Sequence, residues 1–308
     1  MMKDKYLIVI AGPTASGKTA AAIKIAKTLG TVIISADSRQ FYREIPIGTA
    51  APTKEELSEV QHFMIHNLSV DDKYDVADYE SDVMSLLNKL FINLDVVVLT
   101  GGSGLFINAV CDGIDIMPDI TDSVRNKVNI LYENGGIVAL QNEVKLLDPM
   151  YYNIVDKQNP RRLQRALEVC YQTGKPYSSF RNDTPKKRDF KIIKLAIECD
   201  RDVLINRINV RVEKMLSLGL VEEARSMYNK RHLNSLNTVG YKELFDYFDK
   251  KITFSEAVDR IKINTRQYAK RQMTWLRKND DYRWFKIDEI ESVIVDIENI
   301  INGDNDIA

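Results

Sequence analysis

One stretch constrains the fold of this 308-residue chain more than any other. An apolar run, Tyr6–Ala11, is followed by a glycine-framed loop and then by the alanine-rich run Ala20–Leu29. The first run predicts a buried strand and the second a helix. The loop between them, Gly12-Pro-Thr-Ala-Ser-Gly-Lys-Thr19, fits the pattern G-x-x-x-x-G-K-[ST]. The order of strand, loop and helix predicts a phosphate-binding loop.

Each part of that loop has a physical role in holding a diphosphate. Glycines let backbone N–H groups close around the anion, and the positive end of the following helix points at it. Lys18 adds a point charge, and the Thr19 hydroxyl can ligate Mg²⁺. The predicted diphosphate-binding residues are Gly12, Pro13, Thr14, Ala15, Ser16, Gly17, Lys18 and Thr19. The pattern leaves open whether the phosphates belong to a nucleotide or to another diphosphate.

The charge of the chain is balanced overall but uneven along its length. A net charge of −1 argues against a generally basic nucleic-acid binder. However, Pro160–Arg188 carries eight Lys and Arg residues against two acids, and Ser255–Lys286 carries nine against four. Such local basic regions indicate contact with a polyanion, with solvated helix faces as the alternative.

Cysteine usage and hydropathy bear on the compartment. Cys111, Cys170 and Cys199 form no C-x-x-C pair, so neither a disulfide framework nor a zinc site is predicted. The first strand begins within six residues of the N-terminus, so we expect no signal peptide, and no apolar run approaches the about 20 residues of a membrane span. We expect a soluble cytoplasmic protein without a membrane partner.

A second predicted strand, Thr31–Ala36, ends at Asp37-Ser-Arg-Gln40. In open α/β sheets ligands bind outside the carboxyl ends of the strands, so Asp37 should lie beside the phosphate loop. There it suits a base or a metal ligand, although an Asx turn or a helix cap explains it equally well. His62 and His66 lie four residues apart without a third ligand pattern, which favours structural histidines over a metal site.

A third predicted strand, Asp95–Thr100, follows an amphipathic helix expected over Ser81–Leu94 and ends in Gly101-Gly-Ser-Gly104. A kinase or ATPase commonly ends such a strand with an acid that holds the metal. Thr100 and glycines occupy that place here, which argues against an ordinary nucleotide hydrolase.

Helices without strands are predicted from about Pro118 to the stretch 184–188. Asn159 and Pro160 fit an N-cap and a first helical residue. In the helix that follows, Arg161, Arg162 and Arg165 share one flank. Their spacing suits phosphate contact, and pairing with acids such as Glu168 is the alternative.

A strand pattern returns at Phe190–Glu198, and the helices expected over Asp202–Tyr228 carry Arg207 and Arg211 on one face. The predicted fold is therefore α/β, with a P-loop-type parallel sheet core flanked by helices and a helical insertion domain. We expect the first part of the core at 1–117, the insertion at 118–188, and the rest of the core with basic C-terminal helices at 189–308. The acidic tail after Asn302 is expected to fray.

The longest of those basic helices is expected over Ser255–Lys278. Its basic side chains recur at helical spacing among aromatic residues, a combination that suits splayed or single-stranded nucleic acid. For each aromatic residue alone, core packing is the better interpretation. The basic and polar residues are Lys262, Arg266, Gln267, Lys270 and Arg271, and the aromatic ones are Tyr268, Trp275 and Trp284.

These motifs together resemble the tRNA dimethylallyltransferase family, also called tRNA isopentenyltransferases. The family places a threonine more often where Ser103 stands, and a longer side chain where Gly104 stands before Leu-Phe106. No zinc-finger extension follows, which resembles the shorter, bacterial-type form. The matching stretches are 12–19, Ser35-Ala-Asp-Ser38, Gly48-Thr-Ala50, Gly101-Gly-Ser103, Arg161-Arg-Leu-Gln-Arg-Ala-Leu-Glu168, Arg211-Val-Glu-Lys-Met-Leu216 with Gly219-Leu220, Gly240-Tyr-Lys-Glu-Leu244 and Thr265-Arg-Gln-Tyr-Ala-Lys-Arg-Gln272.

The resemblance implies transfer of a dimethylallyl group from dimethylallyl diphosphate to the exocyclic amine of the adenosine just 3′ of a tRNA anticodon. Lys18 and Arg211 would neutralise the leaving diphosphate, Thr19 would assist Mg²⁺, and Asp37 would accept the proton of the amine. The target base would be flipped into the core. The implied partners are the tRNA anticodon stem-loop and the diphosphate, and we expect a monomer. The implied tRNA contacts are Asp37, Ser38, Arg39, Gln40, Ser103, Arg125, Arg161, Arg162, Leu163, Gln164, Arg165, Lys270 and Arg271.

Two other interpretations use the same loop. A small-molecule kinase would bind ATP there, and a P-loop RNA-binding protein would use a nucleotide only to regulate its affinity. The missing acid at the end of the third strand and the two basic regions argue against the kinase.

Overall fold

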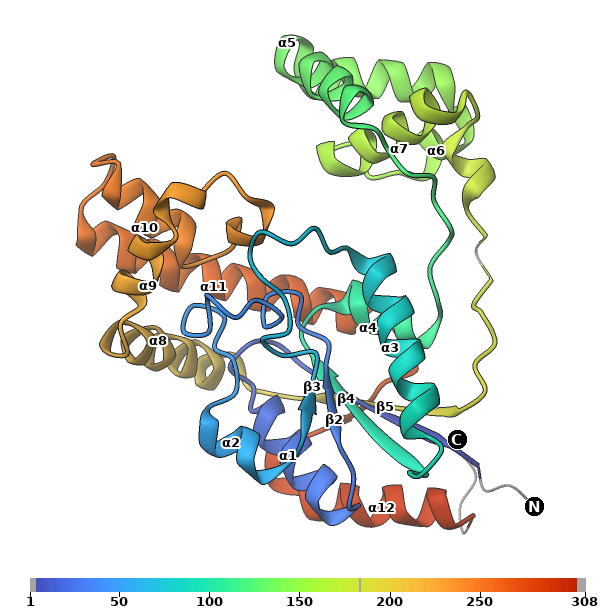
Figure 1. The fold of residues 1–308 in the computed structure, drawn as a ribbon, viewed down its shortest axis with the longest axis vertical. Coiled ribbons are helices and arrows are strands. Elements are labelled where there is room, and N and C mark those ends of the chain that lie inside the picture. The colour runs from blue at the N-terminus through green and yellow to red at the C-terminus, as the bar shows by residue number, and fades with distance from the viewer. Residues whose placement is uncertain (1–3, 183, 304–308) are drawn as a thin grey trace. The chain divides into compact units, whose positions relative to one another are not determined.

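The computed structural model describes residues 4–182 and 184–303 (Figure 1). One compact unit combines the segment up to Asp112 with the segment from Lys187 onward, and the other is Gly113–Lys186. The helical insertion, expected at 118–188, thus occupies 113–186 as a unit of its own. The acidic tail at 304–308 lies outside the described residues.

The first unit is built on a six-stranded sheet in which every neighbouring pair is parallel. This arrangement confirms the predicted parallel α/β core. The outermost strands β3 and β6 were not predicted, because runs of two or three residues show no usable periodicity. In spatial order the strands are β3 (His62–Phe63), β2 (Ile33–Ser35), β4 (Val96–Gly101), β1 (Tyr6–Ala11), β5 (Lys191–Ile197) and β6 (Arg283–Phe285).

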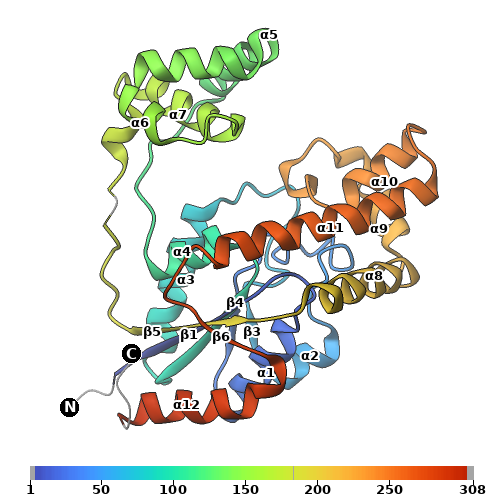
Figure 2. The ribbon, with the colours of Figure 1, turned by 180° about the vertical axis from the view of Figure 1, so that it is seen from behind.

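Helices cover both faces of this sheet, so its central strands are apolar throughout (Figures 1 and 2). All six residues of β1 are buried. Its residues Ile8 and Ile10 pack in the cluster that includes α1 (Lys18–Thr28) and α12 (Ile290–Asn302). The alternate residues Leu7 and Val9 pack with α3 (Val76–Leu90) and α4 (Gly104–Cys111). A short helix, α2 (Lys54–Glu59), and the 3₁₀ turn η4 (Ile287–Glu289) lie beside α1 and α12.

Several boundaries follow from capping. Helix α3 begins at Val76 and not at the expected Ser81, because Asp75 and Asp78 form a reciprocal capping box. Helix α11 begins at Phe254, where Thr253 and Glu256 form the same arrangement. Asn159 caps the helix that begins at Pro160, as the sequence predicted.

Four helices and two 3₁₀ turns form a lobe around a further apolar cluster, which includes Tyr241, Leu244 and Ile261. Gly219, at φ +100°, separates the first two helices in a left-handed conformation that favours glycine. The elements are α8 (Arg201–Ser217), α9 (Leu220–Ser226), η2 (Tyr228–Lys230), η3 (Asn234–Leu236), α10 (Tyr241–Phe248) and α11 (Phe254–Leu276).

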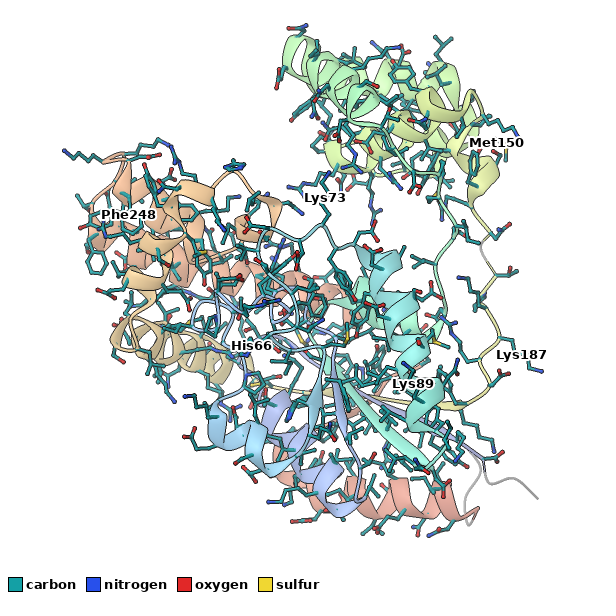
Figure 3. The ribbon with its side chains drawn as sticks, viewed as in Figure 1. His66, Lys73, Lys89, Met150, Lys187 and Phe248 are labelled. Carbon is teal, nitrogen blue, oxygen red and sulfur yellow. The ribbon has the colours of Figure 1, made fainter. Side chains whose placement is uncertain are left out.

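The regular elements among the described residues of the insertion are α5 (Asp122–Leu147), α6 (Pro149–Ile154), α7 (Pro160–Thr173) and the 3₁₀ turn η1 (Tyr177–Phe180). Gly136, at φ 60° and ψ −159°, kinks α5. Asp148 is buried and accepts hydrogen bonds from Tyr151 N and from both N and Oγ of Ser178, which joins α6 to η1. Met150 projects from α6 with 74% of its surface exposed (Figure 3).

In the described part of the chain, no helix combines the length and apolarity needed to cross a membrane.

Candidate active site

The site lies where three strands of the sheet end. Strand register aligns Ala11 with Gly101, and Ser35 with Thr100, so the loops after β1, β2 and β4 begin side by side. Ala36 N donates to Thr100 O at 2.7 Å, and Ser103 N donates to Ala36 O at 3.2 Å. The parallel topology thus places Asp37 beside the phosphate loop, as expected.

The phosphate loop has the backbone geometry that its sequence predicts. Gly17 lies at φ +99° immediately before α1, so the N-terminus of that helix faces the loop. Lys18 Nζ donates to Pro13 O at 2.7 Å and folds back across the loop. The Ser16 hydroxyl is fully buried and has no hydrogen-bond partner among the described residues.

Two arginines of α8, for which the spacing predicted only a shared helix face, both reach the loop. Arg211 Nη1 donates to Thr14 Oγ1 at 2.9 Å, and Arg207 Nη1 donates to Ser16 O at 3.3 Å. Burial, followed by the positive charge of Arg211, lowers the pKa of Lys18 from 10.5 to about 7, against the attraction of Asp37. Burial also lowers the pKa of Arg211. In 4–182 and 184–303 no ion pair involves Lys18 or Arg211, so two partly buried basic side chains lie at the loop without a bound carboxylate.

Of the two interpretations that the sequence left open for Asp37, the structure shows the Asx turn and is compatible with a base or metal ligand. Its Oδ1 accepts from Arg39 N at 3.0 Å, which is an Asx turn. No hydrogen bond to its other carboxylate oxygen is found in the part of the chain that the structure describes. Asp37 also lines a pocket together with Thr14 and Arg211. The turn therefore orients a carboxylate that keeps one oxygen available to a ligand.

The pocket has a volume of about 550 Å³ and lies within the first unit. Both polar and apolar side chains line it. The polar or charged ones include Thr14, Asp37, Ser38, Arg39, Arg211, Lys242, Glu243, Asn264, Gln267, Tyr268 and Arg271, and the apolar ones include Val212, Met215, Leu220, Val239 and Ile261.

Tyr268 closes the pocket beside Asp37. Burial, followed by the negative charge of Asp37, raises the pKa of Tyr268 to about 12, and a hydrogen bond with Ser103 opposes the rise. The phenol is therefore neutral at physiological pH. Ser103 Oγ also accepts from Ser38 N at 3.1 Å, so the hydroxyl expected from the sequence joins the loops after β2 and β4.

The donor set of the loop fits a magnesium ion held mainly by a bound diphosphate. Thr19 offers a hydroxyl in the first turn of α1, and the carboxylate of Asp37 lines the adjoining pocket. No group of three or more His, Cys, Asp or Glu residues suited to a metal occurs among the described residues, so His62 and His66 belong to no such group. Magnesium is commonly bound through one or two protein ligands, substrate phosphates and water.

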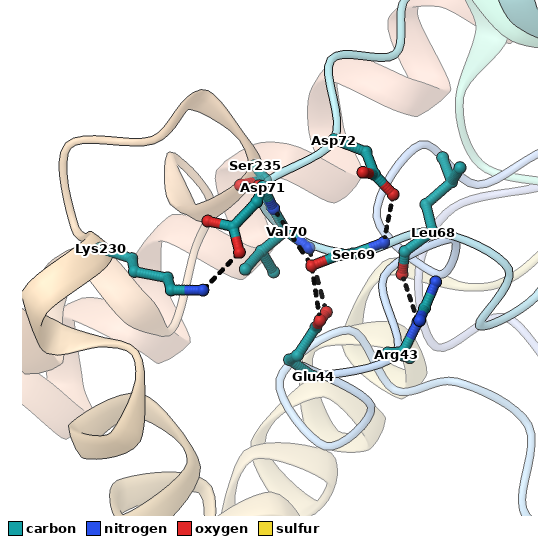
Figure 4. A network of polar contacts seen from close by, with 9 residues as sticks. All are labelled: Arg43, Glu44, Leu68, Ser69, Val70, Asp71, Asp72, Lys230 and Ser235. Atoms are coloured by element: carbon teal, nitrogen blue, oxygen red, sulfur yellow. Dashed lines mark hydrogen bonds and ion pairs between the residues drawn. The ribbon is translucent and has the colours of Figure 1, made fainter.

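Polar contacts join several loops of the first unit (Figure 4). Glu44 accepts from Ser69 Oγ and Val70 N, and Ser235 Oγ donates to Val70 O at 2.7 Å. Glu223 accepts from the backbone N–H groups of Ile47 and Gly48, and Gly48 lines the pocket.

Two of the predicted tRNA contacts are part of this framework. The Arg39 guanidinium donates to Asn234 O and Ser235 O. The Gln40 amide accepts from Ser35 Oγ and donates to Ala50 O. Their polar groups are thus bound within the protein, although Arg39 also lines the pocket.

In the insertion, the predicted contact residues divide between surface and core. Arg125, Arg161 and Arg162 are exposed, and Arg165 lies 3.5 Å from Glu168, so pairing with an acid holds for Arg165 and phosphate contact stays a prediction for the others. Gln164 Nε2 donates to Asn129 Oδ1. The prediction for Leu163 needs correction: its side chain is completely buried in the apolar core of the insertion and offers RNA no surface.

On α11, Lys270 and Arg271 are exposed, and Arg271 lies over the Tyr268 ring at 5.8 Å from its centroid. Trp275 packs against Tyr282, and both Trp275 and Trp284, a residue of β6, pack against the apolar cluster on one face of the sheet, so these two aromatic residues serve the core. Sequence reasoning did not assign Glu243 or Asn264, which line the pocket and hydrogen-bond to each other at 2.6 Å. The stretch 240–244 carried a signal for the first of them.

Comparison with known proteins shows which family this chain resembles. The sequence model of the IPP transferase family matches residues 40–279. The chain is 47% identical to tRNA dimethylallyltransferase 2 of Parabacteroides distasonis, over 96% of this chain and 99% of that protein. It is 49% identical to the tRNA dimethylallyltransferase of Christiangramia forsetii, over 97% and 99%.

Solved structures agree with this result. The tRNA isopentenylpyrophosphate transferase of Bacillus halodurans is 34% identical and superposes with a TM-score of 0.72, over 98% of each chain. A eukaryotic dimethylallyltransferase acting on tRNA has a TM-score of 0.80 over 97% of this chain and 80% of its own, and at 23% identity it supports the fold alone. The chain therefore belongs to the IPP transferase family.

Proposed function

We propose that this protein transfers a dimethylallyl group from dimethylallyl diphosphate to N6 of the adenosine 3′-adjacent to the anticodon of tRNA. The bond between C1 of the dimethylallyl group and the diphosphate oxygen breaks, and a bond between C1 and N6 forms. Diphosphate leaves with the bonding electrons, and one N6 proton passes to Asp37. The products are N6-(dimethylallyl)adenosine and diphosphate.

The observation that carries this proposal is the shared pocket of Asp37, Thr14 and Arg211. The amine of adenine is a weak nucleophile because its lone pair is delocalised into the ring, so a positioned base is needed on that side. On the other side, charge develops on the departing diphosphate, where preorganised cations are most effective. Lys18 and Arg211 provide those cations, and neither is neutralised by a protein carboxylate in the described structure.

Other residues would bind the substrates or the metal without taking part in the transfer step. Mg²⁺, when bound with Thr19 as a ligand, would add positive charge on the diphosphate. The arginines Arg125, Arg161 and Arg162 of the insertion, with Lys270 and Arg271 of α11, would contact tRNA phosphates. Such contacts would offset the few kcal/mol that flipping a base out of its stack costs.

A label-transfer assay tests the function directly. The protein is incubated with Mg²⁺, unmodified tRNA and either dimethylallyl diphosphate labelled in the dimethylallyl group or ATP labelled in the γ-phosphate. We expect dimethylallyl label on adenosine and no transfer from ATP. Phosphate transfer without prenylation would support a kinase, and binding of tRNA without any transfer would support an RNA-binding protein.

The lowered pKa of Lys18 predicts that binding of the diphosphate takes up protons. The free lysine loses its proton above about pH 7, whereas a bound anion favours the charged form. Affinity for inorganic diphosphate should therefore fall between about pH 7.5 and about pH 9, by up to about tenfold per pH unit. Calorimetry in buffers of different ionisation enthalpy measures the proton uptake. Lys18→Ala should bind tRNA normally but bind diphosphate weakly and with a flat pH profile, and a similar slope in both proteins would contradict this role.

The arginine flank of the insertion predicts a salt-dependent contribution to tRNA affinity. Replacing Arg161, Arg162 and Arg165 by Ala should weaken tRNA binding and lower the slope of log K against log salt by about one for each phosphate that the variant no longer neutralises. Affinity for dimethylallyl diphosphate should not change. Exposed lysines of the first unit, Lys54 and Lys89, provide the control when both are changed to Ala (Figure 3 labels Lys89). An unaltered slope in the arginine variant would remove the flank from the interface.

The role of Asp37 predicts a kinetic defect without a folding defect. Asn preserves the size of the side chain and the turn to Arg39 N, but it cannot accept a proton at neutral pH. Asp37→Asn should bind both substrates nearly as well as the parent and lose a factor of about 10² or more in single-turnover rate. Asp75→Asn, at the exposed cap of α3, is the matched control. A rate within about threefold of the parent would exclude Asp37 as the base.

A further inference from the structure

One buried amide on α11 joins two of the loops that form the site. We propose that Gln272 is a positioning residue. It holds the diphosphate loop in register with the loop after β4, which in turn contacts the loop that carries Asp37. The proposal rests on the transfer reaction proposed above, and it adds a residue that is not among those lining the pocket.

Gln272 is 7% exposed and makes one hydrogen bond in each direction. Thr14 N donates to its Oε1 at 2.8 Å, and its Nε2 donates to Gly102 O at 2.8 Å. Both partners are backbone groups of fixed polarity, so the amide has a single favourable orientation. A side chain of similar size without polar atoms would fill the same space but leave a buried N–H and a buried C=O unpaired, which is costly.

These two hydrogen bonds connect the residues around the diphosphate loop with the residues around Asp37. On the diphosphate side, the Thr14 hydroxyl accepts from Arg211. On the other side, Gly102 is followed by Ser103, whose backbone N–H donates to Ala36 O and whose hydroxyl accepts from Ser38 N. Asp37 lies between Ala36 and Ser38 in the chain. Gln272 is thus the side chain that joins the loop of the leaving group to the loops that orient the base.

The glycine at position 102 supports this arrangement. A Cβ built on Gly102 would lie 2.2 Å from Gln272 Nε2, so any other residue would displace the amide. One turn further along α11, Trp275 makes an equally close approach, with its ring 2.3 Å from a Cβ built on Gly104. One turn before, Tyr268 is hydrogen-bonded with Ser103. Three consecutive contacts of one helix face therefore fix the loop 101–104.

Transfer requires C1 of the dimethylallyl group and N6 of adenine to meet in a closely defined geometry. A shift of about 1 Å between the two loops would lower the rate by about 10²-fold while leaving each binding loop intact. Loss of Gln272 should therefore reduce the chemical step far more than it reduces the affinity for either substrate.

The first test compares Gln272→Met with the parent protein in single-turnover transfer, with tRNA and dimethylallyl diphosphate both saturating. We expect a rate lower by about 10-fold to 10²-fold, with affinities for tRNA and for inorganic diphosphate each within about threefold of the parent. Gln61→Met is the matched control, because its exposed side chain lies away from the pocket residues and should leave the rate unchanged. A parent-like rate in Gln272→Met would overturn the proposal, and so would a rate loss accompanied by an equal loss of both affinities.

A double-mutant cycle with Gly102→Ala then tests whether the two residues act as one unit. Gly102→Ala displaces the amide and should lower the rate about as much as Gln272→Met does. Because both changes break the same connection, the double variant should be no slower than the slower single variant. Rate losses that multiply would show independent effects and overturn the connection. If the parent transfers the dimethylallyl label and only these expectations fail, the positioning role alone is wrong, whereas an inactive parent overturns both this role and the proposed function.

Discussion

The site depends on backbone hydrogen bonds that fasten together the loops at the carboxyl edge of the sheet. Ala36 donates its N–H to Thr100 O and accepts from Ser103 N, so the residue before Asp37 is bound on both sides to the end of β4. This contact is possible only with glycine at position 101, where a Cβ would lie 2.1 Å from Ala36 O. Asp37 thus takes its place from main-chain geometry, and its side chain remains available to a ligand. A carboxylate held by backbone contacts needs no second ionisable group to orient it.

The charge of the bonding partner distinguishes a basic residue that stabilises the fold from those proposed to bind the diphosphate. Arg188 is almost fully buried, and its guanidinium is matched by Glu80 Oε1 at 2.8 Å and by Ala109 O at 2.7 Å. Lys18 and Arg211 are also withdrawn from water, but their hydrogen bonds go to a carbonyl and a hydroxyl, which carry no net charge. Two desolvated like charges side by side destabilise each other. The lowered pKa of Lys18 is the sign of that cost, and a bound diphosphate would offset it.

Much of this arrangement could be predicted from the sequence because it is encoded in short, ordered patterns. The phosphate loop, the three strands that lead into the site and the N-cap Asn159 all depend on local residue types and were found. Pairings between distant segments could not be predicted in the same way. Arg39 and Gln40 follow Asp37 in the chain, yet their polar groups bind the main chain at Asn234 and Ala50. Leu163 stands among arginines, and only the packing of the insertion shows that it points inward.

The loop after β4 also explains why this phosphate loop is unsuited to the metal chemistry of an ordinary kinase. An acid that holds the metal would have to stand at the end of β4, but every position there is already committed. Thr100 donates its hydroxyl to Ile10 O, a side chain at 101 would collide with the main chain at Ala36, and one at 102 would collide with Gln272. Close packing of three loops and one helix has thus replaced a metal ligand with a set of fixed contacts. With no acid at the end of β4, a bound diphosphate would be stabilised mainly by the loop N–H groups, Lys18 and Arg211, which suits the proposed reaction, in which the diphosphate leaves intact.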